Sequence, residues 1–254
     1  MSDTPDGPVT IILGAAGGIG SAVCQRRAAA GDRLVLASRS EERLQRLAEE
    51  LRRAGSPEVA VIPTDATHAP AVDALFTQVV ERFGRVDGVS HCVGSILLKP
   101  AHLTTDNDWA ETLSINLTSA FHVVRSAVKA MSKGGSIVLV STVAARLGLT
   151  NHEAIAAAKA GVQGLALSAA ATYAPKQIRV NVVAPGLVRT PLADRLTSNE
   201  ASLKASTAMH PLGRIGEPDD VAAAIAWLLD PATTWVTGQI IGIDGGLATI
   251  RSRG

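Results

Sequence analysis

The stretch Val9-Thr10-Ile11-Ile12-Leu13-Gly14-Ala15-Ala16-Gly17-Gly18-Ile19-Gly20-Ser21 decides the fold. A short, mostly apolar run is typical of a buried strand, and a cluster of glycines follows it directly. Glycine lets the backbone turn tightly and approach a diphosphate, while a helix that begins near Ser21 offers unpaired N–H groups and the positive end of its dipole. This order of strand, glycine turn and helix predicts a dinucleotide-binding turn. The alternative is a tight turn that binds nothing.

Short apolar runs and helix-like stretches alternate along the chain. Seven runs, each about a strand long, occur at residues 9–13, 34–37, 59–62, 86–90, 137–140, 180–184 and 239–243. Stretches rich in Ala, Leu, Glu and Arg predict helices at 21–30, 41–54, 71–83, 109–131, 154–173 and 219–229. Alternation favours parallel pairing, because parallel strands need crossover connections and burial on both faces. We expect an α/β fold, a Rossmann-type doubly wound, seven-stranded parallel sheet with helices on both faces.

No linker or repeat divides the 254 residues, and this length suits a single domain over 1–254. The longest stretch without a strand signal is 187–218, after the sixth predicted strand, where an α/β sheet usually carries substrate contacts. We interpret it as a substrate lid. Ordinary surface helix and loop is the alternative, which the polar run 197–202 allows.

Composition argues against several classes of function. Hydrophobic residues make up 46% of the chain and charged residues 19%, which is typical of a folded core. The 24 basic and 23 acidic residues nearly cancel and aromatics are only 3%, so we expect no nucleic-acid partner. Cys24 and Cys92 form no CxxC or other metal-ligand spacing. His152-Glu153 could begin the HExxH motif of a zinc-binding helix, but position 156, where the second histidine would stand, is Ala. We therefore expect no metal. The N-terminal residues show no apolar signal region, so we expect a cytoplasmic protein. The apolar runs are far shorter than the roughly 18 residues needed to cross a bilayer, so we expect no membrane partner.

The residues after the second predicted strand bear on the choice of dinucleotide. An NAD site usually places Asp or Glu there to hold the ribose 2′-hydroxyl. Here the place holds Ser38 and Arg39. A guanidinium can pair with a 2′-phosphate and no carboxylate repels it, so the charges favour NADP(H), with NAD(H) still possible. The alternative is that Arg39 is only a solvated residue near a helix start.

The glycine string resembles the motif of the short-chain dehydrogenase/reductase family, and the resemblance continues along nearly the whole chain. The matching segments are Thr64-Asp65-Ala66 at the adenine-contacting motif, His91-Cys92-Val93-Gly94 at the Asn-Asn-Ala-Gly motif, Ile115-Asn116 at the catalytic Asn, 178–181 through Pro185-Gly186, Thr190, 211–214 and 244–246. The resemblance implies a carbonyl–alcohol oxidoreductase, usually tetrameric, with a Ser-Tyr-Lys-Asn active site. The cofactor-binding residues implied here are Gly14, Ala16, Gly18, Ile19, Gly20, Ser38, Arg39, Asp65, Ala66, Cys92, Gly94, Lys159, Pro185, Gly186, Val188 and Thr190.

The catalytic motif departs from the family's pattern. Lys159 falls on the family's Lys, but the Tyr position four residues earlier is Ile155, and the Ser position falls on Thr142, which keeps a hydroxyl. Losing a positioned proton donor costs about 10²–10⁴-fold, whereas orientation of two reactants supplies roughly 7–11 kcal/mol of the barrier. We expect weakened rather than absent redox activity. Tyr173 lies fourteen residues after Lys159, about 21 Å along a helix, and cannot substitute.

His152 is the candidate replacement for the tyrosine. It stands three residues before Ile155, and side chains at i and i+3 share a helix face. Imidazole titrates near neutrality, as proton transfer requires. The divergent enoyl reductases of the family carry their Tyr seven residues before the Lys, which is the place of His152 here. The alternative is a loop residue that caps the helix together with Asn151.

The predicted catalytic residues are therefore Asn116, Thr142, His152 and Lys159. Lys159 is expected to reach the nicotinamide ribose, or else to be simply solvated. Asn116 is expected to hold a water for a proton relay, or else to satisfy backbone groups where its helix bends.

Two hypotheses follow for the function. The first is an NADP(H)-dependent oxidoreductase that transfers a hydride to or from a small carbonyl, alcohol or activated alkene, with a non-standard proton donor. The alternative is a catalytically impaired dinucleotide-binding protein that serves as a sensor or oligomer partner. Apolar residues in the segments expected to form the pocket indicate a substrate with an apolar part; they are Leu97, Leu98, Leu147, Leu149 and Leu192. A homo-oligomer, tetramer or dimer, is implied by the resemblance, and the Ala-rich helix 154–171 could pack against a second copy.

Overall fold

The alternating runs fold into one parallel sheet. The structure, a computed structural model that describes residues 7–251, contains seven strands in the order β3-β2-β1-β4-β5-β6-β7, with every neighbouring pair parallel. Their bounds are β1 (Val9–Leu13), β2 (Arg33–Ala37), β3 (Glu58–Val61), β4 (Gly88–His91), β5 (Gly135–Val140), β6 (Ile178–Pro185) and β7 (Ile240–Ile243). The predicted fold class is confirmed, because the continuous apolar runs do correspond to strands covered on both faces.

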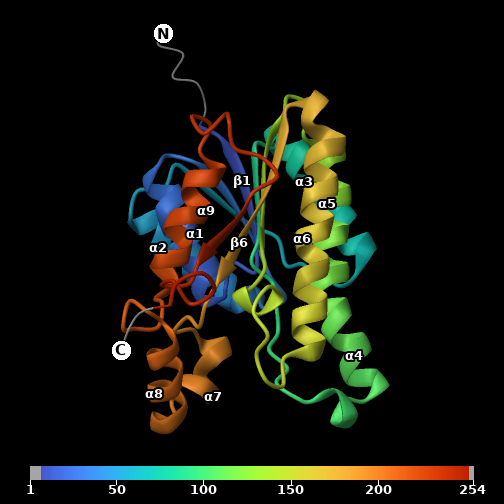
Figure 1. Ribbon diagram of the computed structural model, residues 1–254. Coiled ribbons are helices and arrows are strands. Elements are labelled where there is room, and N and C mark those ends of the chain that lie inside the picture. Colours follow the sequence, from blue (N-terminus) through green and yellow to red (C-terminus); the bar gives the residue numbers. More distant parts are fainter. Residues whose placement is uncertain (1–6, 252–254) are drawn as a thin grey trace.

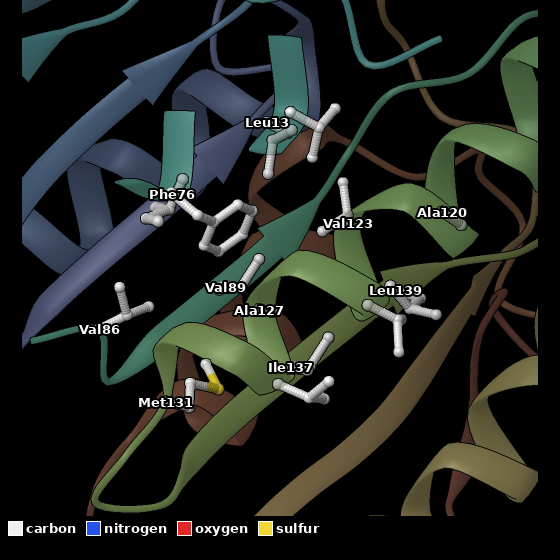
Figure 2. Packing of buried hydrophobic residues seen from close by; sticks show 14 of the residues in the cluster. Leu13, Phe76, Val86, Val89, Ala120, Val123, Ala127, Met131, Ile137 and Leu139 are labelled. Carbon is white, nitrogen blue, oxygen red and sulfur yellow. The ribbon is translucent and has the colours of Figure 1, made fainter. Parts of the chain in front are cut away.

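Two groups of helices cover the sheet (Figure 1). One face carries α1 (Gly18–Ala29), α2 (Glu41–Arg53) and α9 (Pro218–Leu229), and the other carries α3 (Ala69–Phe83), α5 (Ser119–Ala130) and α6 (Glu153–Tyr173). Figure 2 shows the second face, where Val123 and Ala127 of α5 lie over Val89 of β4 and Ile137 of β5. Burial of such aliphatic side chains contributes about 1.5–3 kcal/mol each.

The strand order reverses between β1 and β4. From β1 the chain runs outward to β2 and β3, then returns to β4 on the other side of β1 and continues to β7. Leu13 at the end of β1 pairs with His91 at the end of β4. Ligands of open α/β sheets bind outside the carboxyl ends of the strands at such a switch point, so the fold itself places the candidate site there.

The single regular helix predicted over 109–131 is wrong. Instead α4 (Asp106–Leu113) leads through a π-helical segment (Ser114–Thr118) into α5. The wide turn makes the Ser119 N–H donate to the Ser114 carbonyl, and the Ser119 hydroxyl donates to the Ile115 carbonyl at 2.6 Å. Side chains thus satisfy backbone groups that a regular helix would pair internally, an arrangement that apolar periodicity does not reveal.

The 187–218 segment contains two short helices that the strand signals did not predict. They are α7 (Asp194–Thr197) and α8 (Glu200–Met209), at the end of the molecule where the strands finish (Figure 1). Its two ends are held together by a bridge between Val188 and Gly216.

One helix has the length and composition to cross a membrane. Residues Glu153–Lys176 include an 18-residue window with a mean hydropathy of 1.3. Alanine dominates this window, so the sequence shows no long run of large apolar residues there. Half of that window is buried within the protein, and a helix that packs on a sheet passes the same test.

Candidate functional site

The glycine turn joins the ends of three strands. Gly14 has a φ of +80°, and a Cβ there would lie 2.8 Å from the carbonyl carbon of Cys92. The N–H groups of Gly14 and Ala15 donate to the Ala37 carbonyl at 2.8 and 3.2 Å. A Cβ at Gly20 would collide with the Gly14 carbonyl. Glycine is therefore required here for backbone to approach backbone.

The start of α1 offers N–H groups to an anion. Within residues 7–251 no side chain caps this helix, whose first turn holds no acidic residue. A Cβ at Gly18 would lie 2.8 Å from the Thr190 methyl group, so the loop after β6 packs over the turn. The turn leaves no room for a Cβ at Gly18, and the first N–H groups of α1 are not capped by any side chain that the structure describes. These two features suit the binding of a dinucleotide's diphosphate.

The ends of β2 and β3 carry the groups expected around the adenosine. The Ser38 hydroxyl is buried with no hydrogen-bond partner in the described part of the chain, while Arg39 is exposed beside it. Hydrogen bonds from the Thr67 hydroxyl and N–H hold the pKa of Asp65 below its usual value, and the charge of Arg39 adds a smaller effect. Ala66 is buried and its carbonyl lies 3.2 Å from Nδ1 of His122.

Arg43 is a cationic residue that the sequence reasoning missed. Its guanidinium donates to the Ala16 carbonyl of the glycine turn at 2.7 Å. The available signal was its place in the first turn of α2, four residues after Arg39. A second guanidinium therefore lies against the turn.

A cavity of about 280 Å³ opens at the carboxyl edge of the sheet. Three predicted catalytic residues line it, Thr142, His152 and Lys159, together with Ile155. The predicted cofactor residues in its wall are Ile19, Cys92, Gly94, Pro185, Gly186, Val188 and Thr190. Its apolar lining includes Leu98, Leu149 and Leu192 as expected, whereas Leu97 and Leu147 do not line it.

Lys159 is buried rather than solvated. Its Nζ donates to the Val140 carbonyl at 2.9 Å. Burial lowers the pKa of Lys159 to about 8, since a charged ammonium loses its hydration there.

Asn116 lies behind the cavity and holds its wall in place. Its Oδ1 accepts the Ser95 N–H at 3.1 Å, and its Nδ2 donates to the Ser95 hydroxyl at 2.8 Å and to the Thr112 carbonyl at 3.0 Å. A Cβ at Gly94 would lie 3.1 Å from the Asn116 Oδ1 and 3.4 Å from the Lys159 Nζ. Of the two expected roles, the bond to the Thr112 carbonyl supports the one in which Asn116 satisfies a backbone group where its helix bends. The water relay stays a prediction.

The two hydroxyls at the end of β5 differ in their surroundings. Both residues line the cavity, where the Thr142 hydroxyl accepts the Ala144 N–H at 3.3 Å and donates to the Pro185 carbonyl at 3.4 Å. The Ser141 hydroxyl donates to the Lys159 carbonyl at 2.9 Å and accepts from Gln163 at 3.0 Å, and it is buried. Of the two, Thr142 has the weaker hydrogen bonds and is the better placed to bind a substrate oxygen.

His152 precedes the first residue of α6 and is half-buried. His152 is the N-cap residue of α6, at the helix start as the alternative expects, although its side chain makes no capping hydrogen bond within the described chain. Its Nδ1 lies 2.8 Å from the Thr150 carbonyl. A carbonyl only accepts, so Nδ1 carries a proton and Nε2 is the ring atom left for exchange. His152 directly before α6 lines the same cavity as Ile155 and Lys159 in the first two turns of that helix. A role in proton transfer stays a prediction.

His91 supports the π-helical segment from β4. Its Nε2 lies 3.0 Å from the Ser119 hydroxyl, which itself donates to the Ile115 carbonyl, so Nε2 must be the donor. Burial lowers the pKa of His91 to about 3, with a smaller effect from the charge of Lys159. The ring is neutral, and its Nδ1 has no partner among residues 7–251.

Comparisons with known proteins agree with this geometry. The family model described as Enoyl-(Acyl carrier protein) reductase matches residues 14–248. The chain is 34% identical to a hydroxynaphthalene reductase-like protein, Arp2, of Metarhizium anisopliae, over 96% of each chain. It resembles the structure of a short-chain type dehydrogenase/reductase from Mycobacterium ulcerans, with a TM-score of 0.92, 30% identity and coverage of 96% of this chain and 90% of that one. It also resembles an actinorhodin polyketide ketoreductase solved with NADPH, with a TM-score of 0.91, 31% identity and coverage of 97% and 99%.

The lowered pKa of Lys159 predicts a pH dependence of stability. Between pH 8 and about 10.5 the folded protein has released this proton while the unfolded chain still holds it, so the free energy of unfolding should rise with pH. Lys159→Met should remove this rise, because methionine does not titrate. Urea denaturation at pH 7, 8, 9 and 10.5 measures the free energy of unfolding of both proteins.

The exposed Lys133→Met is the matched control and should behave as the wild type. Burial raises the pKa of Cys92 to about 11, which acts in the opposite direction above about pH 9, and the charge of Lys159 contributes to that pKa, so only the rise between pH 7 and 9 is assigned to Lys159. An unchanged rise in Lys159→Met would assign the pH dependence to another group.

Proposed function

The chain belongs to the short-chain dehydrogenase/reductase family of oxidoreductases, and from that premise we propose that it transfers a hydride between NADP(H) and a small carbonyl, alcohol or activated alkene. The observation that carries the proposal is the cavity of about 280 Å³, whose wall combines the glycine-turn residue Ile19 with Thr142, His152 and Lys159. One space thus adjoins both the predicted cofactor site and polar groups able to bind a reacting oxygen.

In the proposed reduction, the residues that line the cavity have different roles. A bound dinucleotide supplies the hydride, which goes to the substrate carbon, and the oxygen takes up one proton. In this proposal the Thr142 hydroxyl donates a hydrogen bond to that oxygen and Lys159 binds the ribose hydroxyls, and both residues line the cavity. Positioning of this kind supplies roughly 7–11 kcal/mol of the barrier.

We assign the proton transfer to Nε2 of His152. Because Nδ1 donates to the Thr150 carbonyl, a protonated imidazole gives its proton from Nε2 and returns to a neutral ring without moving. Ile155, one turn further along α6, has no proton to exchange, and its buried side chain shapes the cavity wall. The apolar side chains Ile96, Leu98 and Leu149 support a substrate with an apolar part.

The proposed preference for NADP(H) rests on two positive charges, one just after β2 and one in the first turn of α2. Arg39 and Arg43 are both exposed; Arg39 follows Ser38, whose hydroxyl has no partner among residues 7–251, and Arg43 donates to the Ala16 carbonyl of the glycine turn. Guanidinium groups suit a 2′-phosphate, because they donate several hydrogen bonds in one plane.

Arg39→Glu should weaken NADPH binding by about 10–100-fold, since it replaces a charge-assisted contact with a repulsion, and should leave NADH binding within about threefold. Titration with each nucleotide, followed by nicotinamide fluorescence, measures the two dissociation constants. Arg53→Glu makes the same change of charge at the far end of α2 and should leave both unchanged. Equal affinities in the wild type would contradict the NADP(H) preference, and binding of neither nucleotide would overturn the proposed function.

His152→Ala should reduce turnover by about 10²–10⁴-fold and leave NADPH affinity unchanged, because only the proton donor is lost. A panel of small ketones, alcohols and enoyl compounds, assayed by NADPH absorbance, measures this. The exposed His102→Ala is the control. Unchanged turnover in His152→Ala would remove His152 from the mechanism.

Ile155→Tyr is the reciprocal experiment. Faster ketone reduction in this variant would show that the scaffold lacked only a proton donor, whereas loss of the wild-type reaction would show that Ile155 shapes a different pocket. A wild type that binds NADPH but turns over nothing in the panel would indicate a dinucleotide-binding protein that acts as a sensor or oligomer partner.

We further propose a homodimer or homotetramer that assembles through α4, α5 and α6. Apolar side chains exposed on these helices, Trp109, Phe121 and Leu167, support an interface there. Light scattering should give two or four times the mass of the 26.2 kDa chain, and Leu167→Lys should shift the protein toward the monomer. Val80→Lys on α3 is the control, and a monomeric wild type would contradict the interface.

A further inference from the structure

His210 connects α8, in the 187–218 segment, to the start of that segment directly after β6. It directly follows α8 and is buried, with 3% of its surface exposed. Its ring borders the cavity of about 280 Å³ and a second cavity of about 360 Å³ behind it. A buried titratable side chain therefore lies between the candidate active site and the second cavity.

Both ring nitrogens of His210 bond to backbone. Nδ1 lies 2.6 Å from the Ser206 carbonyl, which can only accept, so Nδ1 carries a proton. Nε2 accepts the Leu187 N–H at 3.3 Å and must be unprotonated. The contact thus requires the neutral ring in one tautomer.

The loop after β6 is shaped to this ring. A Cβ at Gly186 would lie 2.5 Å from Nε2 of His210, although the φ of Gly186 is one that any residue adopts. The glycine is therefore required for space. The adjoining Pro185 carbonyl contacts Thr142, and Val188 and Thr190 follow in the same loop, so the ring packs against the backbone that carries predicted cofactor contacts.

We propose that His210 is a positioning residue that holds the 187–218 segment closed over the cavity, and that protonation of its Nε2 releases the segment. The expected effect of this release on cofactor binding rests on the proposed function, whereas the hydrogen bond between His210 and Leu187 does not. Once protonated, the ring presents an N–H to the Leu187 N–H, and a hydrogen bond becomes a repulsion between two donors.

The other ionisable groups around His210 already have partners of their own. In the second cavity, Arg214 forms a two-point ion pair with Asp220 at 2.6 and 2.9 Å, and Asp244 accepts the Gly246 and Ala248 N–H groups. Lys159 and His152 line the first cavity. Of the groups described here, His210 alone joins α8 to the β6 loop by hydrogen bonds to both.

The experiment compares hydrogen–deuterium exchange at pH 7.5 and pH 5.5 in the unliganded full chain. His210→Gln keeps an acceptor for the Leu187 N–H and does not titrate, so the ratio of wild type to variant at each pH removes the intrinsic pH dependence of exchange. In segments 186–189 and 199–210 this ratio should rise at least about threefold on acidification. His210→Leu, which lacks the acceptor, should exchange rapidly at both values, and His102→Gln should match the wild type. An equal pH response in wild type and His210→Gln would overturn the proposal, whether or not His210→Leu folds.

Cofactor binding gives the second readout, with NADP⁺ as the probe because the reduced form decomposes in acid. The dissociation constant of the wild type should rise at least about threefold between pH 7.5 and pH 5.5, and that of His210→Gln should stay constant. An equal rise in both proteins would contradict the link between His210 and the cofactor loop. Failure of the wild type to bind at either pH would overturn the proposed function, while the exchange ratio would still test the contact.

Discussion

The backbone of Gly14 lies against the peptide group that joins Cys92 and Val93, and the geometry of the site depends on that approach. A Cβ would come within 2.9 Å of three of its atoms, so only glycine allows the ends of β1 and β4 to meet. The strand order reverses between these two strands. The turn fixes the start of α1, and the segment after β4 forms a wall of the cavity, so one close contact sets both the anion cradle and the space beside it.

On the other side of the cavity, polar groups are buried at a cost that hydrogen bonds must offset. Lys159, Asn116 and His91 are all buried, and each bonds to a neighbouring backbone or hydroxyl group. The π-helical segment is part of this arrangement, because its wide turn is held by Ser119 and presents Asn116 to the backbone at Ser95. Such networks favour one structure when every member is satisfied. In this network the exception is Nδ1 of His91, which has no partner among residues 7–251.

The strands and the glycine turn could be predicted from the sequence because their causes are local. A run such as 9–13 must be apolar to be covered on both faces, and Gly14 must lack a side chain to turn. The π-helical segment, the two short helices after β6 and the contacts of Arg43 and His210 could not be predicted. They depend on partners far along the chain, such as Ala16 for Arg43 and Leu187 for His210, and neither periodicity nor spacing records which residues meet. The site residues could be named from a family pattern, but their bonds could not.

His152 directly before α6, and Ile155 and Lys159 in its first two turns, line one cavity, so the fold constrains their spacing but not their chemical groups. Each residue of a helix is rotated by about 100° from the one before, so a single insertion between His152 and Lys159 would turn one of them away from the cavity. A substitution at the same spacing changes only the chemical group that is presented. Evolution can therefore exchange the reactive side chain at this end of α6 one residue at a time, while the count of residues along the helix must stay fixed.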